Sequence, residues 1–138
     1  MSEGEGVRGI VLGHGLMARG LVDAVVKISG VDDGILVPLS NEGKSPQTLQ
    51  EELDLLIGEG PTVLFTDLPS GSCALAARVS CKEVTRQVVI SGVNLPILLD
   101  FVFNRHLSLN ELVPRLLSKG IGSVKSVPDF SEHANRPL

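Results

Sequence analysis

The spacing of apolar residues changes abruptly near the start of the chain, and this change constrains the fold more than any other feature of the sequence. Residues 7–12 form a short apolar run typical of a β-strand, whereas from Met17 onward apolar side chains recur at helical spacing. The change falls on Gly13-His14-Gly15. In an open α/β sheet, ligands bind beyond the carboxyl ends of parallel strands, where the next helix presents free backbone N–H groups. We therefore predict that His14 carries the chemistry of this chain.

The same alternation of strand and helix continues through the rest of the sequence. Three apolar runs predict further strands at residues 35–39, 61–66 and 86–91, and four segments predict further helices at residues 46–57, 73–84, 97–103 and 109–119. Four βα units in succession indicate an α/β fold, a three-layer sandwich with a mostly parallel, doubly wound sheet of four strands. Residues 121–127 alternate apolar and polar side chains, which predicts an additional edge strand.

Length and composition narrow the class of protein. A chain of 138 residues, 43% of them hydrophobic, is expected to form one domain, here residues 1–127, followed by a polar tail at residues 128–138. The net charge is −4 and the 12 Lys and Arg residues are scattered, so no nucleic-acid partner is expected. The sequence has neither a signal-peptide pattern nor an apolar run of roughly 18 residues, so we predict a cytoplasmic protein without membrane insertion.

Cysteine and histidine spacing predicts no metal site. Cys73 and Cys81 form neither a C-x-x-C motif nor part of a second cysteine pair, so they are interpreted as buried, reduced thiols. His106, near a helix end, and His133, in the tail, lie in unrelated sequence contexts. We therefore expect neither a metal nor another cofactor.

Polar residues follow three of the predicted strands, at His14, Asp67 and Asn94. The carboxyl ends of parallel strands lie along one edge of a sheet, so these residues can meet despite their separation in sequence. A neutral imidazole has one basic nitrogen, which can attack phosphorus, and a carboxylate on its N–H fixes the tautomer and stabilises a cationic ring. Asp67 is the candidate for that carboxylate, although it could also only cap the next helix. Asn94 is interpreted as a structural loop residue.

These motifs, taken in order, resemble a known family. The Gly13-His14-Gly15 turn, residues 65–72 (FTDLPSGS) and residues 91–98 (SGVNLPIL) are similar to the enzyme IIA domain of the mannose family of the phosphoenolpyruvate-dependent sugar phosphotransferase system, over about residues 7–127. The resemblance implies a phosphotransferase whose histidine accepts a phosphoryl group from the phosphocarrier protein HPr and passes it to a IIB component for sugar uptake.

The resemblance also assigns roles to individual residues. His14 becomes the phosphorylated residue, Asp67 its orienting carboxylate, and Ser72 a contact to phosphate that could equally be a helix cap. Backbone N–H groups at Gly15, Gly71 and Ser72 are expected to bind the phosphoryl oxygens. Arg19, close in sequence to His14, is interpreted as a solvated charge that could also meet phosphate.

The chain departs from the family pattern in the loop after the aspartate. Members usually have Gly-Gly-Ser-Pro where this chain has Ser70-Gly71-Ser72-Cys73, so the loop that touches phosphate or the partner protein is expected to differ. Because the sequence ends at Leu138, IIB is expected to be a separate chain.

The resemblance further implies a homodimer. Mannose-type IIA domains pair by exchanging a last, antiparallel strand, for which Gly120 and Gly122 are the candidate hinge and residues 121–127 the candidate strand. The apolar segment at residues 97–103 is more hydrophobic than one small sheet requires, which favours the same conclusion.

Alternative functions are left open by the residues themselves. A regulatory module would use the same phosphorylated histidine to control another protein rather than to transport sugar. The segment from Gly13 to Ala18 also satisfies the dinucleotide-binding pattern G-x-G-x-x-A, but residues 35–39 end without an acidic residue for a ribose. A histidine phosphatase is dismissed, because it would need an arginine where Gly13 stands. His14 could also merely pack within its turn.

Overall fold

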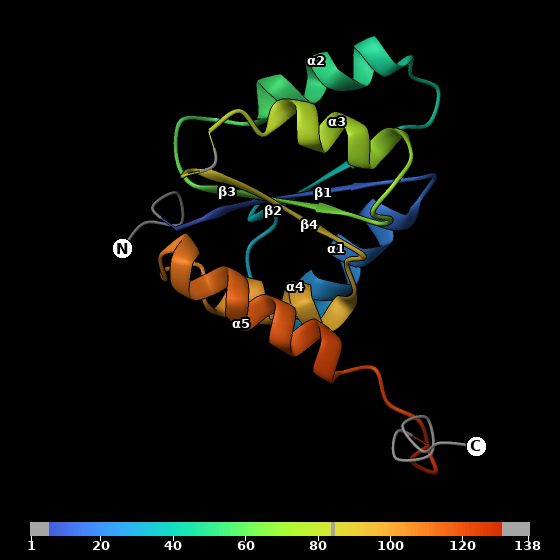
Figure 1. Ribbon diagram of the computed structural model, residues 1–138, viewed down its shortest axis with the longest axis vertical. Coiled ribbons are helices and arrows are strands. Elements are labelled where there is room, and N and C mark those ends of the chain that lie inside the picture. The colour runs from blue at the N-terminus through green and yellow to red at the C-terminus, as the bar shows by residue number, and fades with distance from the viewer. Residues whose placement is uncertain (1–5, 84, 131–138) are drawn as a thin grey trace, which may run out of the picture.

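The computed structural model describes residues 6–83 and 85–130, and within them strands and helices alternate along the chain (Figure 1). In chain order these are β1 (Arg8–Gly13), α1 (Met17–Ser29), β2 (Leu36–Ser40), α2 (Pro46–Leu56), β3 (Thr62–Thr66), α3 (Ser72–Ser80), β4 (Gln87–Ser91), α4 (Leu95–Phe103) and α5 (Leu109–Gly122). The predicted α/β class and order of elements are confirmed. The helix predicted at residues 73–84 ends earlier, at Ser80, and Val84 lies outside the described residues.

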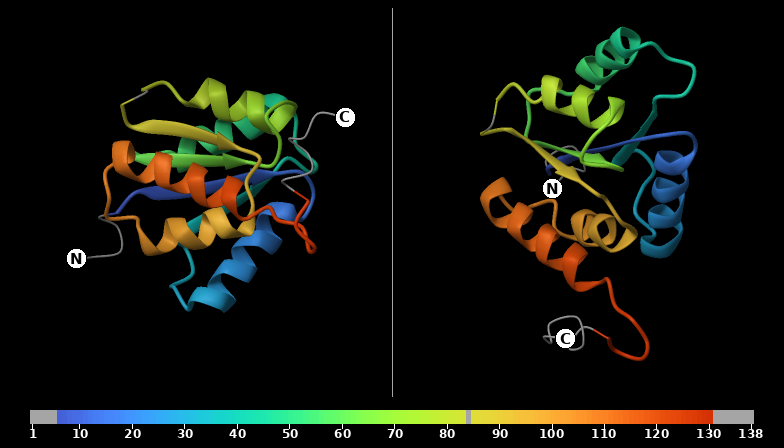
Figure 2. Two further views of the ribbon diagram at one scale, coloured as in Figure 1. Left: turned by 60° about the horizontal axis from the view of Figure 1, so that its bottom comes forward. Right: turned by 45° about the vertical axis from the view of Figure 1, so that its right-hand side comes forward.

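The sheet is four-stranded and parallel, with the order β2-β1-β3-β4. Helices α2 and α3 cover one face, and α1, α4 and α5 cover the other, so the three-layer architecture is confirmed (Figures 1 and 2). Every residue of β3 is buried, as expected for a central strand of a parallel sheet covered on both sides. Such a strand holds the residue that follows it in a fixed position.

Side-chain caps fix where three of the helices begin. Ser45 Oγ accepts the backbone N–H of Thr48, and Ser108 Oγ accepts that of Glu111. Asn94 Oδ1 accepts the N–H of Ile97 at the start of α4. Each such cap is worth about 1 kcal/mol, because it satisfies a donor that the helix leaves unpaired.

The edge strand predicted at residues 121–127 is wrong for the single chain. Helix α5 continues through Gly122, so Ile121 is helical, and residues 123–130 form no strand. The physical reason is that a strand needs a neighbouring edge, whereas the end of α5 directs the chain away from the sheet (Figure 1). The end of the predicted tail, residues 131–138 with His133, lies outside the described residues, as do residues 1–5.

No helix in the described part of the chain combines the length and the apolar character that crossing a membrane requires.

Two glycines offer a matched test of packing, because a methyl group would meet crowded atoms at one and open space at the other. A Cβ on Gly9 would lie 2.6 Å from both Leu36 Cδ2 and Phe101 Cε2, whereas a Cβ on Gly20 in α1 would meet nothing within 4 Å. Gly9→Ala should lower the free energy of unfolding by about 1–3 kcal/mol through overpacking. Gly20→Ala should raise it by up to about 1 kcal/mol, because alanine favours a helix interior. Urea denaturation of both variants measures the two signs, and equal changes would contradict the packing at Gly9.

Candidate functional site

Two neighbouring strands bring His14 and Asp67 together at one edge of the sheet. His14 directly follows β1 and Asp67 directly follows β3, and the two strands pair in parallel with Leu12 opposite Thr66. The backbone of Gly15 has a φ of 58°, which allows the tight turn from strand to helix. The His14 side chain is 45% exposed, whereas that of Asp67 is only 8% exposed. A reactant can therefore reach the imidazole while the carboxylate stays screened.

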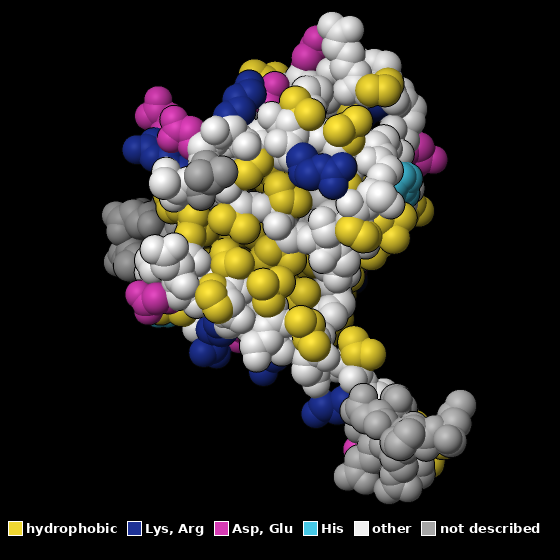
Figure 3. Space-filling model, viewed as in Figure 1, with side chains coloured by type: hydrophobic (Ala, Val, Ile, Leu, Met, Phe, Trp, Pro, Cys, Tyr) yellow, Lys and Arg dark blue, Asp and Glu magenta, His cyan; other side chains and the backbone are white. Residues whose placement is uncertain are grey.

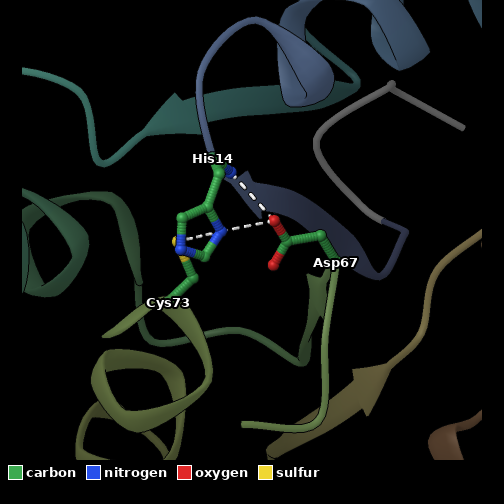
Figure 4. A group of neighbouring side chains, drawn as sticks. All are labelled: His14, Asp67 and Cys73. Atoms are coloured by element: carbon green, nitrogen blue, oxygen red, sulfur yellow. Dashed lines mark hydrogen bonds and ion pairs between the residues drawn. The ribbon is translucent and has the colours of Figure 1, made fainter. Parts of the chain in front are cut away.

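The carboxylate of Asp67 binds His14 at two points. Asp67 Oδ2 accepts the backbone N–H of His14 at 2.9 Å and lies 2.6 Å from the ring nitrogen Nδ1 (Figure 4). Its other oxygen, Oδ1, accepts the backbone N–H of Leu68 at 2.9 Å. Because an ionised carboxylate only accepts hydrogen bonds, the proton between the two groups belongs to Nδ1 in a neutral ring. The lone pair of Nε2 is then the basic site of the imidazole.

The same contacts favour the ionised form of Asp67. Burial raises the pKa of this carboxyl, but the hydrogen bonds from His14, the charge of His14 and the N–H of Leu68 lower it by more, so that its pKa falls below the usual 3.8. Asp67 is therefore a carboxylate at neutral pH. A positive charge that develops on the imidazole is stabilised by this fixed negative charge.

The N-terminal end of α3 packs against the imidazole. A Cβ on Gly71 would lie 4.0 Å from His14 Cε1, and Gly71 has a φ of 96°, so a glycine permits both the approach and the conformation. Ser72 is the first residue of α3, and its Oγ accepts a long hydrogen bond of 3.5 Å from Asn41 Nδ2. The structure thus brings the start of α3 to His14, where free N–H groups favour an anion. Phosphate binding by Gly15, Gly71 and Ser72 stays a prediction.

Cys73 is a member of this site that the sequence analysis missed. Its burial is confirmed, but its Sγ lies 3.8 Å from His14 Nδ1, on the side of the ring facing α3 (Figure 4). Burial and the charge of Asp67 raise the pKa of the thiol, and a hydrogen bond with Ser72 opposes the shift. The one sequence signal for this position was that Cys73 stands where members of the family usually have proline.

The structure brings together three side chains of metal-binding type that the sequence spacing did not connect. His14, Asp67 and Cys73 each offer one ligand atom, and these atoms all lie within 4.8 Å of one another. Sequence spacing could not reveal the cluster, because the three residues come from three different elements.

Asn94 has the structural role that the sequence predicted. Besides capping α4, its Nδ2 donates to the carbonyl oxygen of Gly120 in α5 at 3.2 Å. The residue therefore joins two helices. Arg19 lines a surface depression beside Gly15, together with Ser40 and Glu42.

Comparison with known proteins identifies the family. Residues 9–116 match the family model EIIA-man, described as the PTS system fructose IIA component. The chain belongs to this family. IIA components of the phosphotransferase system are phosphotransferases that carry a phosphoryl group, so the predicted enzyme class and the mannose-type IIA resemblance are both confirmed. The match favours this assignment over the dinucleotide-binding alternative.

Individual relatives agree with the family assignment. The PTS system fructose-specific EIIA component of Bacillus subtilis (strain 168) is 32% identical over 132 residues, which cover 92% of this chain and 88% of that protein. The phosphotransferase system component EIIA from Streptococcus agalactiae superposes with a TM-score of 0.80 at 20% identity, covering 88% of this chain and 98% of that one. The mannose/sorbose specific IIA subunit from Enterococcus faecalis gives a TM-score of 0.77 at 22% identity, covering 88% and 94%. The two structures establish the shared fold.

The lowered pKa of Asp67 predicts how stability depends on pH. A carboxyl whose folded pKa lies below its unfolded value stabilises the fold above the unfolded pKa, and this contribution disappears as the pH falls through the folded value. The difference in unfolding free energy between wild type and Asp67→Asn should therefore be largest above about pH 5 and shrink below it. Urea denaturation across this range measures the difference. The control is Asp23→Asn, which removes an exposed carboxylate paired with Lys27 and should change stability little at any pH. A difference in unfolding free energy between wild type and Asp67→Asn that did not shrink at low pH would contradict the assigned contacts.

Proposed function

We propose that His14 is phosphorylated on Nε2 by phospho-HPr and that the phosphoryl group then passes to a IIB component during sugar uptake. The observation that carries the proposal is the contact between Asp67 Oδ2 and His14 Nδ1, which leaves Nε2 as the nucleophile. Membership of the IIA family supplies the class of donor and acceptor. This function requires a cytoplasmic location, and its domain comprises residues 1–127, with residues 128–138 as a tail.

The transfer needs only groups that the site contains. The Nε2 lone pair forms a bond to phosphorus while the bond between phosphorus and the donor breaks, and the donor keeps that electron pair. The ring retains its proton on Nδ1 and becomes cationic, and Asp67 stabilises that charge. Backbone N–H groups at Gly15 and at the start of α3 neutralise charge on the phosphoryl oxygens, which is the main requirement of phosphoryl transfer. Transfer to IIB is the same step in reverse.

The sugar is not determined at this site. The relatives carry the names fructose-specific and mannose/sorbose specific, although all share the fold. The regulatory alternative uses the same first step and differs only in what phospho-His14 acts on. The two functions therefore separate at the second transfer.

Phosphorylation of His14 is tested with phosphoenolpyruvate, enzyme I and HPr, by intact mass at alkaline pH. Wild type should gain one phosphoryl group, and His14→Ala should gain none. The control His106→Ala should behave as wild type, because this exposed histidine lies between α4 and α5 and not in the site. Asp67→Asn should slow the reaction by one or more orders of magnitude, by analogy with other carboxylates that fix a histidine tautomer. A mass shift that persists in His14→Ala would refute the proposal.

The second transfer is tested by adding purified IIB to the phosphorylated protein. Loss of the phosphoryl group from His14 with its appearance on IIB supports transport. Retention on His14 in the presence of a competent IIB contradicts transport and leaves the regulatory role.

We also propose that the protein is a homodimer in which residues 123–130 of each chain cover the sheet edge of the other. Strand β4 lies at the end of the sheet, and its outer edge has no neighbouring strand among the described residues. Apolar side chains gather over β4 and between α3 and α5 (Figure 3), around a depression lined by Val88, Leu109 and Val113 among others. Val124 and Val127 are 79% and 99% exposed in the single chain, which favours their burial against a partner.

Light scattering at micromolar concentration tests the dimer. The full chain should be dimeric, and so should the control Leu55→Asp, which changes an exposed leucine of α2. The double variant with Val124→Asp and Val127→Asp should be monomeric and less stable, and so should a chain that ends at Ser123. A monomeric full chain would exclude the dimer, and a dimeric truncated chain of unchanged stability would exclude the proposed segment.

A further inference from the structure

The two cysteines of the chain have different surroundings. Cys81 Sγ donates a hydrogen bond to the backbone carbonyl of Gln87 at 2.9 Å, away from the site. Cys73 Sγ instead points toward His14 Nδ1, at 3.8 Å. Cys73 is completely buried, whereas the imidazole beside it is 45% exposed. Cys73 therefore adds a sulfur ligand to a pair of groups that already bind one another.

The three ligand atoms all lie within 4.8 Å of one another, so small side-chain movements bring them to the spacing of tetrahedral ligands. Zn²⁺ bonds of about 2.0–2.3 Å place tetrahedral ligand atoms roughly 3.3–3.6 Å apart. The observed 3.8 Å between Nδ1 and Sγ is close to this range. The 2.6 Å between Nδ1 and Asp67 Oδ2 must widen by less than about 1 Å, which a small rotation of the exposed His14 ring provides. Nitrogen, carboxylate oxygen and thiolate sulfur are all ordinary zinc ligands.

We propose that His14, Asp67 and Cys73 bind Zn²⁺ and that this binding prevents phosphorylation of His14, an inference whose second half rests on the proposed function. Three protein ligands leave a fourth position for water, so the site differs from a closed structural site with four protein ligands.

Metal coordination prevents phosphorylation because it changes which ring nitrogen of His14 carries the proton. The cation takes the place of the proton between Nδ1 and Asp67, and in the neutral ring that proton then resides on Nε2. The thiol loses one proton to solvent, because a coordinating sulfur is deprotonated by the metal even where burial disfavours the free thiolate. With its lone pair on Nε2 occupied by a proton, His14 is no longer a nucleophile. Phosphorylation and metal binding are therefore mutually exclusive.

Metal binding is tested with Zn²⁺ in competition with a chromophoric chelator, and with Co²⁺ as a spectroscopic probe. Wild type and Cys81→Ser should bind one ion and show a thiolate-to-Co²⁺ charge-transfer band. Cys73→Ser and Cys73→Ala should lose the band and bind Zn²⁺ more weakly by at least the factor of about 10–100 that loss of a supporting group costs. Circular dichroism checks that each variant is folded. Two substitutions of Cys73 are used so that the test remains possible if one of them prevents folding. Equal Zn²⁺ affinity in wild type and both Cys73 variants, or a Co²⁺ complex without the band, would overturn the site.

The effect on phosphorylation is measured with purified phospho-HPr as donor, so that Zn²⁺ cannot act through enzyme I. Each protein is compared with its own reaction without Zn²⁺. At a Zn²⁺ concentration that saturates wild type, the mass shift should disappear in wild type and Cys81→Ser, whereas in Cys73→Ser it should equal the shift that this variant shows without Zn²⁺. Equal phosphorylation of wild type with and without saturating Zn²⁺ would refute the exclusion. Absence of phosphorylation without Zn²⁺ would instead refute the proposed function, and the binding measurements would still decide the metal site.

Discussion

The contact between Asp67 Oδ2 and His14 Nδ1 is the interaction on which the proposed phosphoryl transfer depends. It fixes the tautomer of the imidazole, holds a negative charge beside it, and through the backbone N–H of His14 also fixes the turn in which the residue lies. Both partners follow adjacent parallel strands, so their separation is set by the sheet rather than by a flexible loop. Burial of every residue of β3 holds one of these strand ends in place. In β1, the lack of a side chain at Gly9 lets Phe101 pack closely against the strand.

Helix α3 completes the site from the opposite side of the ring. Gly71 allows its first turn to approach the imidazole, and the same turn supplies free N–H groups for an anion and the buried sulfur of Cys73. One helix terminus therefore presents chemically different groups to one histidine. Phosphate would bind to the backbone N–H groups, whereas the proposed Zn²⁺ would bind to the thiolate and the carboxylate. The position of the ring proton decides between them, because only a ring protonated on Nδ1 has a free lone pair on Nε2.

The lateral edge of the sheet at β4 raises a different physical problem. In the part of the chain that the structure describes, no strand pairs with the outer edge of β4, and apolar side chains of α5 lie beside that edge. The segment that follows α5 exposes Val124 and Val127. An unpaired edge next to apolar surface favours association. The proposed dimer interface and the His14 site lie in different parts of the fold, since His14 follows β1, which lies inside the sheet.

The sequence by itself determined the alternating elements, the helix caps at Ser45 and Ser108, and the placement of His14 and Asp67 at strand ends, because spacing, capping and strand order are local properties. It also predicted that both residues would share one edge, since parallel strands align their carboxyl ends. Only the tertiary structure decided that Cys73 faces the imidazole, because the rotation of α3 depends on packing against α2 and the sheet. It likewise decided that Ile121 is helical rather than extended, because alternating residues form a strand only where another strand's edge receives them.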